Sequence, residues 1–148
     1  MAEHKMHEIT AQYLEKCKQE LDHLKNVEVE ENKRALQEAR ALGDLSENSD
    51  YDFAKAEQGR INARIEVLED IIKYHIIIAE EWYTVSIDGG KQVALQLVGV
   101  LEADPEESKI SKESPIGKAI TGHIDGEEVQ YLSGAGTKHT VKIIAIGR

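Results

Sequence analysis

Gly43-Asp44-Leu45-Ser46-Glu47-Asn48 is a polar segment that interrupts two long stretches in which apolar residues recur at alternating spacings of three and four. That spacing is typical of helices that pack against each other along a seam, and the glycine-containing break between them predicts a turn. We therefore expect residues 1–78 to form an antiparallel coiled-coil hairpin with an acidic tip. Each arm has about 30 to 35 residues, which corresponds to a rod of about 45 to 50 Å.

The seam of the second arm is the more regular of the two. Its expected members are Tyr51, Ala54, Gln58, Ile61, Ile65, Leu68, Ile72 and His75. The first arm keeps the same alternation and resumes it after a polar interval, at Leu14, Cys17, Leu21, Leu24, Ala35 and Leu42. Cys17 is the single cysteine, so it is expected to pack on the seam as a small hydrophobe, and no disulfide within the chain is possible.

From about Glu80 the pattern changes to that of strands. Short runs rich in β-branched or alternating apolar residues are separated by glycine-containing turns, at residues 82–87, 93–101, 129–132 and 140–146. Ser114 followed by Pro115 has the pattern of a helix start, with an N-cap and then proline at the first helical position. We therefore expect an α+β chain in which the hairpin is followed, at residues 79–148, by a small antiparallel sheet domain with one short helix.

The composition limits the partners and the compartment. The formal net charge is -10, so free duplex nucleic acid, a dense polyanion, is not expected to bind strongly. No apolar run approaches the roughly 18 residues of a membrane span, and the polar N-terminus lacks the apolar core of a signal peptide. We expect a cytoplasmic protein without membrane contact or a structural metal. The terminus that carries His4 and His7 is expected to fray.

The acidic residues of the tip have two interpretations. Asp44 and Glu47 have the spacing of a capping box, with Asp44 as N-cap of the second helix and Glu47 at its third position. This structural interpretation does not account for Asp50 and Asp52, although acids near a helix N-terminus also favour its dipole. The functional interpretation is that the carboxylates help to hold Mg²⁺. Two carboxylates alone bind that ion weakly, so a partner must complete its coordination.

Basic residues also lie near the tip. Arg40 on the first arm and Lys55 on the second are expected at similar heights. They could pair with neighbouring acids, which would contribute only a few tenths of a kcal/mol. They could instead contact a phosphate backbone, and the pattern alone does not decide between the two.

Two separate motifs resemble a known family. Residues 39–51, Ala-Arg-Ala-Leu-Gly-Asp-Leu-Ser-Glu-Asn-Ser-Asp-Tyr, continue through Ala54-Lys55 and Gln58-Gly59, and together they resemble the tip of the bacterial Gre transcript-cleavage factors, most of all the GreA branch. The later segments 98–104, 110–111 and 114–119 resemble the signature of the C-terminal domain of the same family. The resemblance covers nearly the whole chain in the right order.

The resemblance implies a transcription elongation factor that binds RNA polymerase and inserts its hairpin through the secondary channel when the nascent RNA has backtracked. The residues that match Asp44 and Glu47 would help to hold a Mg²⁺ shared with the polymerase, and so promote endonucleolytic cleavage of the RNA. The protein would complete the active site of its partner rather than act as an enzyme itself. The positions that match the RNA-contacting residues are Arg40 and Lys55.

For the second domain the resemblance implies an FKBP-like fold, which does not imply prolyl isomerase activity. Glu113, Ser114 and Pro115 match the surface that binds the polymerase. The helix-cap interpretation of Ser114 is compatible with that role. We expect the protein to be a monomer.

The chain also departs from the family pattern. It is shorter before Val98, the acidic segment Asn26-Val27-Glu28-Val29-Glu30 replaces a basic residue and a proline, and Ser133-Gly134-Ala135-Gly136 replaces a Pro-Gly-Gly turn. The alternative function is a non-catalytic regulator that binds the same channel on the same scaffold, and Asp44 and Glu47 at the tip favour cleavage over it. A coiled-coil adaptor without a polymerase partner would explain the hairpin but not the second motif.

Overall fold

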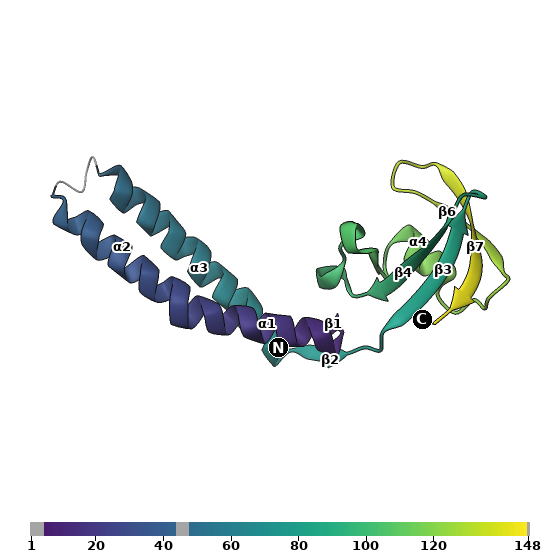
Figure 1. The fold of residues 1–148 in the computed structure, drawn as a ribbon, viewed down its shortest axis with the longest axis horizontal. Coiled ribbons are helices and arrows are strands. Elements are labelled where there is room, and N and C mark those ends of the chain that lie inside the picture. The colour runs from purple at the N-terminus through teal and green to yellow at the C-terminus, as the bar shows by residue number, and fades with distance from the viewer. Residues whose placement is uncertain (1–4, 44–47, 148) are drawn as a thin grey trace. The chain divides into compact units, whose positions relative to one another are not determined.

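The computed structural model describes residues 5–43 and 48–147, which form two compact units (Figure 1). One is a helical hairpin over Leu14–Tyr74, and the other combines Met6–Tyr13 with the chain from His75 onward. The α+β class is confirmed. No helix in the described part of the chain is both long and apolar enough to cross a membrane.

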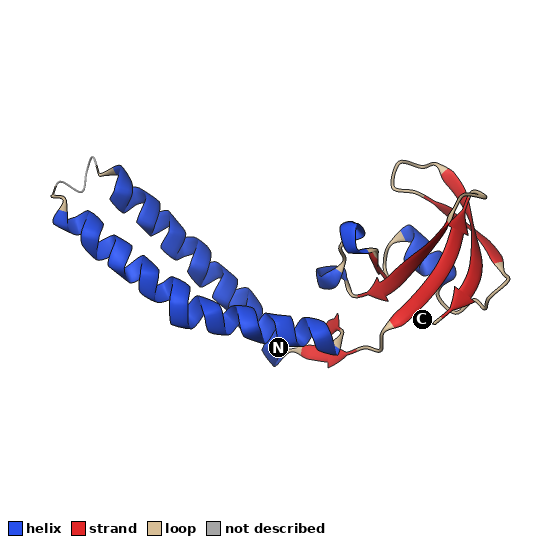
Figure 2. Ribbon diagram, in the orientation of Figure 1, coloured by secondary structure: helices blue, strands red, loops and turns tan. Residues whose placement is uncertain are grey.

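The hairpin is built from two helical arms that run side by side (Figure 2). The first arm consists of α1 (Ala11–His23), the π-helical turn η1 (Leu24–Glu28) and α2 (Val29–Ala41), and the second is α3 (Ser49–Lys73). The antiparallel hairpin predicted from the apolar spacing is therefore present.

The seam follows the prediction on α3 and near the start of the first arm. Ala54, Ile61 and Leu68 are buried, as are Cys17 and Leu24. At the end of α3 the fully buried residue is Ile71, whereas the expected Ile72 is half-buried.

Beyond η1 the prediction for the first arm is wrong. Ala35 and Leu42 are exposed, Leu42 at 69%, and the buried residues of α2 are Asn32, Leu36 and Ala39. The seam is thus displaced by one position along the chain. The π-helical turn explains this, because its wider i to i+5 hydrogen bonding accommodates one more residue than an α-helical turn does. The turn coincides with the acidic segment that departs from the family pattern.

The two arms are joined by polar contacts as well as by apolar packing. The guanidinium of Arg64 donates two hydrogen bonds to the carboxylate of Glu20, at 2.5 and 2.9 Å. Inside the seam, Nδ2 of Asn32 donates to the carbonyl of Ala54 at 2.9 Å. The polar residue on the seam is therefore hydrogen-bonded, which removes most of the cost of burying it.

The second unit contains a five-stranded sheet in the order β5-β4-β3-β7-β6. Its strands are β3 (Glu81–Ile87), β4 (Gln92–Val98), β5 (Lys109–Ser111), β6 (Glu128–Leu132) and β7 (Lys138–Ile146). Strands are present at all four predicted runs, but the run expected at 93–101 ends as a strand at Val98, and Val100 and Leu101 lie in a 3₁₀ helix. The sheet core is apolar and includes Val85, Leu97, Val141, Ile143 and, from the short helix α4 (Pro115–Ile120), Ile120.

One strand pair differs from the antiparallel expectation. β4 and β5 are parallel, whereas the β3–β4, β3–β7 and β6–β7 pairs are antiparallel. Between the parallel strands the chain passes through two short 3₁₀ helices, η3 (Val100–Glu102) and η4 (Pro105–Glu107). A parallel pair needs such a crossover connection, because a tight turn would reverse the strand.

From His7 onward the N-terminal segment is not frayed, which differs from the expectation, and His4 lies outside the described residues. β1 (His7–Ile9) pairs in parallel with β2 (His75–Ile77), and both Ile9 and Thr10 are fully buried. Thr10 donates from its backbone nitrogen and its hydroxyl to the two carboxylate oxygens of Glu102, at 3.0 and 2.8 Å. At Gly99 a Cβ atom would lie 1.9 Å from the carbonyl oxygen of Glu8, so only glycine permits this approach. The first strand is thus an integral part of the sheet unit.

Candidate functional site

The tip of the hairpin is organised by Asn48. Its backbone is extended (φ -92°, ψ 97°) and its Oδ1 accepts a hydrogen bond from the backbone nitrogen of Tyr51 at 3.1 Å, which makes it the N-cap of α3. Its Nδ2 donates to the carbonyl of Ala39, in the last turn of α2, at 2.5 Å. One side chain therefore satisfies a free donor of one helix and an acceptor of the other.

The predicted capping box is wrong. The N-cap of α3 is Asn48, and the third helical position is occupied by Tyr51. The helix begins four residues later than the capping box required, so Glu47 precedes the cap and cannot return a bond from within the first turn. Asp44 and Glu47 lie outside the described residues. The cap of α3 needs neither carboxylate.

Two further acids occupy the first turn of α3. Asp50 and Asp52 are exposed, and the partial positive charge of the helix N-terminus favours carboxylates at these positions. Within residues 5–43 and 48–147, no three or more His, Cys, Asp or Glu side chains are grouped in a way that could hold a metal ion.

The predicted basic residues flank the tip from both arms. The guanidinium carbon of Arg40 lies 5.9 Å from the centroid of the Tyr51 ring, within the range of a cation–π contact. The ammonium of Lys55 donates to Oε1 of Gln58 at 3.1 Å. Neither side chain forms an ion pair with a described carboxylate. Among the described residues, the structure therefore does not show the pairing with neighbouring acids that was one interpretation of Arg40 and Lys55.

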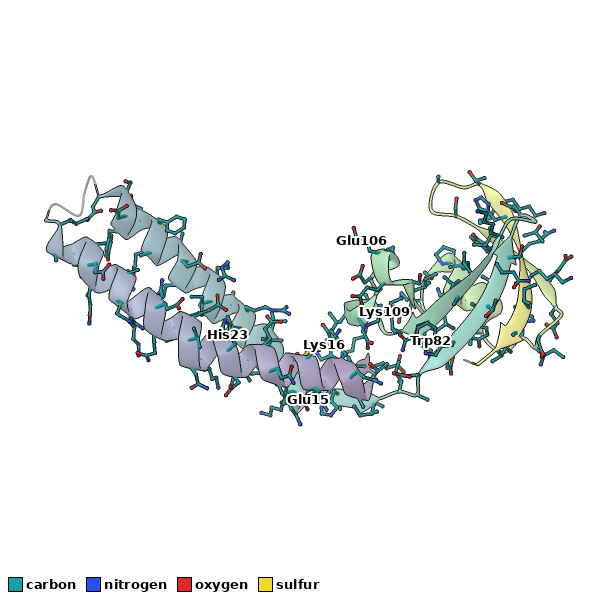
Figure 3. All side chains as sticks on the ribbon, in the orientation of Figure 1. Glu15, Lys16, His23, Trp82, Glu106 and Lys109 are labelled. Atoms are coloured by element: carbon teal, nitrogen blue, oxygen red, sulfur yellow. The ribbon has the colours of Figure 1, made fainter. Side chains whose placement is uncertain are left out.

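The basic residues farther from the tip behave differently. Lys33 pairs with Glu30 at 3.3 Å, Arg60 with Glu28 at 3.0 Å, and Arg64 with Glu20. These three cations are held by carboxylates of the hairpin, whereas Arg40 and Lys55 are not held by any described carboxylate. Other polar side chains of α1, among them Lys16 and His23, stand exposed on the hairpin (Figure 3).

The second predicted surface lies at the start of α4. Oγ of Ser114 accepts from the backbone nitrogen of Gly117 at 3.1 Å and donates to the carbonyl of Ser111 at 2.7 Å. The predicted N-cap is confirmed, with Pro115 at the first helical position. The Ser114 hydroxyl is thus occupied by the cap, whereas Glu113 and Pro115 are exposed and open to a partner.

Sequence reasoning missed the double role of Asn48 at the tip. A signal was present, because asparagine is among the preferred N-cap residues and Asn48 directly precedes the helical pattern. The competing Asp44 and Glu47 spacing obscured it. The bond from Asn48 to Ala39 depends on where the two arms approach each other, which local sequence does not reveal.

The whole chain is similar to known proteins. Residues 7–77 match the family model for the N-terminal part of the GreA/GreB transcription elongation factors, and residues 72–148 match the model for their C-terminal part. Among curated relatives, transcription elongation factor GreA of Acholeplasma laidlawii is 45% identical over 157 residues, covering 99% of both chains. GreA of Geobacillus kaustophilus and of Bacillus subtilis are each 38% identical, also covering 99% of both chains.

Solved structures were compared as well. A structure of the transcription factor Gfh1 has a TM-score of 0.47 and 27% identity, covering 100% of both chains. Gfh1 of Thermus thermophilus has a TM-score of 0.45 and 29% identity, covering 97% of this chain and 100% of the other.

Proposed function

The chain belongs to the GreA/GreB family of transcription elongation factors, and from this premise we propose that it binds bacterial RNA polymerase through the secondary channel and stimulates cleavage of the nascent RNA in backtracked complexes. The observation that carries the proposal is the construction of the tip. Asn48 caps α3 and bonds it to α2, so the cap of the helix does not require Asp44 or Glu47.

Asp44 and Glu47 are proposed to contribute oxygen ligands to a Mg²⁺ that the polymerase holds as well. Carboxylate oxygens suit this hard cation, which commonly uses only one or two protein carboxylates. When bound, the ion would stabilise the attacking and leaving oxygens of phosphodiester hydrolysis. The factor is thus proposed not to be an enzyme itself, but a cytoplasmic monomer that completes the active site of its partner.

Arg40 and Lys55 are proposed to contact the RNA 3′ segment. The support is their position beside the tip and the lack of an ion pair with any described carboxylate. The contact of Arg40 with the Tyr51 ring holds its guanidinium near the start of α3.

Glu113, Ser114 and Pro115 are proposed to anchor the protein on the polymerase. Glu113 and Pro115 are exposed, and the Ser114 cap holds the backbone that carries them. Glu113→Lys and Pro115→Ala should weaken binding to purified core polymerase. Glu106→Lys is the matched control, because Glu106 is an exposed acid of η4 in the same unit (Figure 3).

The deciding experiment uses stalled elongation complexes in which the RNA can be followed by length. Wild-type protein and Mg²⁺ should shorten the RNA, and Asp44→Asn and Glu47→Gln should each slow this strongly, because each removes a proposed ligand of the shared ion. Asp52→Asn, which removes a neighbouring exposed acid, should retain activity. Variants that cleave as fast as wild type would overturn the role of the carboxylates. A wild-type protein that binds polymerase without shortening the RNA would instead be a non-catalytic channel regulator.

A further inference from the structure

A groove opens between α2 and α3, a few turns from the tip. Its volume is about 180 Å³, and its floor consists of the buried residues Asn32, Ala54 and Ile61. Ala35 and Phe53 form its exposed apolar walls. The hydrogen bond from Asn32 to the Ala54 carbonyl occupies the polar groups of the floor, so the groove presents mainly apolar surface.

Phe53 is the outstanding residue of this groove. It is the single phenylalanine of the chain, and it is 73% exposed. An apolar cavity of about 150 Å³ accepts a benzene-sized group. The groove is therefore large enough for one bulky apolar side chain packed against Phe53.

The charge around the groove is negative. Glu28, Glu31 and Glu57 line it. Arg60 pairs with both Glu28 and Glu57, whereas Glu31 has no cationic partner among the described side chains. Three carboxylates and one guanidinium leave a net negative rim.

We infer that this groove docks a basic segment of RNA polymerase that inserts one large apolar side chain against Phe53; this rests on the proposed function. The rim charge selects the occupant. A polyanionic RNA would be repelled, and a second copy of this chain carries a formal net charge of -10. A positively charged protein segment with an apolar anchor complements both the rim and the floor.

The position of the groove fits this occupant. Phe53 to Ile61 lie in the first half of α3, which begins at Ser49. At about 1.5 Å per residue, the groove is within about 20 Å of the end of the hairpin. A hairpin that enters the polymerase as proposed would carry a groove this close to its end into the enzyme with it.

The inference is tested by two variants of the groove. Phe53→Ala should raise the Kd for purified core polymerase by about tenfold, which is the scale of one aromatic anchor at an interface. Glu31→Lys should raise the Kd several-fold. Binding of this variant should also depend less on salt than binding of the wild type. Both residues are exposed, so thermal unfolding followed by circular dichroism should stay near that of the wild type.

Matched controls lie on the same helices outside the groove. Val67→Ala removes a 45% exposed apolar side chain of α3, and Glu38→Lys reverses an exposed acid of α2. Both should keep the wild-type Kd. If the groove variants bind as tightly as these controls, the inference is overturned.

A photo-crosslinking amino acid at position 53 identifies the occupant directly. In the complex with polymerase and RNA it should capture a polymerase peptide of net positive charge. Capture of RNA, or of a second copy of this chain, would overturn the inference.

The two proposals fail in different ways. If the wild type shortens the RNA and Phe53→Ala has the wild-type Kd, the groove inference fails and the proposed cleavage function stands. If the wild type binds polymerase without cleavage, the proposed cleavage function fails. The Kd values of the groove variants and their controls then still test whether the groove docks the polymerase.

Discussion

The side-chain amide of Asn48 donates to the carbonyl of Ala39 at 2.5 Å while its oxygen caps α3. The end of α2 and the start of α3 are thus joined by one residue. The cap satisfies a donor that a helix N-terminus otherwise leaves free, and the second bond satisfies an acceptor near the C-terminus of α2.

The two bonds of Asn48 can be separated by substitution. Asn48→Asp keeps the capping oxygen but loses the donor to Ala39, and we expect a loss of about 1 kcal/mol in the free energy of unfolding. Asn48→Ala loses both bonds and should cost about 2 kcal/mol. Urea unfolding followed by far-ultraviolet circular dichroism measures the difference. If Asn48→Asp is as stable as wild type, the bond to Ala39 contributes nothing.

Two glycines provide a contrasting pair. Gly99→Ala would place a Cβ atom 1.9 Å from the Glu8 carbonyl oxygen, so the sheet unit should lose about 2 to 4 kcal/mol of stability. Gly59→Ala has open space around the new atom within α3, and the hairpin should gain about 0.5 to 1 kcal/mol.

The fluorescence of Trp82, the single tryptophan, reports on the sheet because it lies in β3. We expect Gly99→Ala to shift this fluorescence transition to lower urea, and Gly59→Ala to shift the helical transition to higher urea. If the fluorescence transition of Gly99→Ala occurs at the same urea concentration as that of the wild type, β1 moves away from Gly99 at little cost in stability.

The ion pair between Glu20 and Arg64 should make the hairpin sensitive to acid. The pKa of the Glu20 carboxyl is lowered from its ordinary value of 4.5, chiefly by the hydrogen bond from Arg64. The stabilisation is therefore fully present above about pH 4.5 and is lost as the pH falls through the lowered pKa. Because both side chains are about 40% exposed, it amounts to less than about 1 kcal/mol.

Glu20→Gln isolates this contribution. Above pH 5 the variant should be slightly less stable than wild type in helical unfolding experiments, and the difference should shrink toward pH 3. If the difference in stability between Glu20→Gln and wild type does not change with pH, the charge of Glu20 does not contribute to the stability of the hairpin.

Arg40 should act on the RNA rather than on the fold. Arg40→Gln removes a cation that has no described carboxylate partner, so we expect slower cleavage, by about tenfold, with unchanged polymerase binding. Lys33→Gln is the matched control, because Lys33 is held by Glu30 on the same helix. Equal cleavage by both variants would assign Arg40 no role in binding RNA.

Much of this architecture could be predicted from local patterns. The apolar spacing located both arms of the hairpin, and the β-branched runs located four strands of the sheet. Ser114 and Pro115 marked the start of α4 because their capping preferences are strong and local. Asp44 and Glu47 stood out by their charge, but their proposed role came from the resemblance to a family.

The errors arose where distant parts of the chain meet or where the helical period changes. Ala35 and Leu42 were assigned to the seam because the π-helical turn η1 was not recognised. β1 is only three residues long, and Ile9 is buried by pairing with a strand that starts at His75. The short strand β5 was missed because its pairing with β4 depends on a crossover.

The place of β1 in the sheet unit affects the order in which the chain can fold during synthesis. Thr10 is bonded to Glu102, 92 positions later, and β1 pairs with β2 at His75–Ile77, so the first strand must wait for partners in the second half of the chain. The hairpin contains both of its arms by Lys73 and can fold before that. Closing such a long loop is slow compared with local helix formation. We therefore expect the emerging chain to expose Ile9 until the second half has been translated.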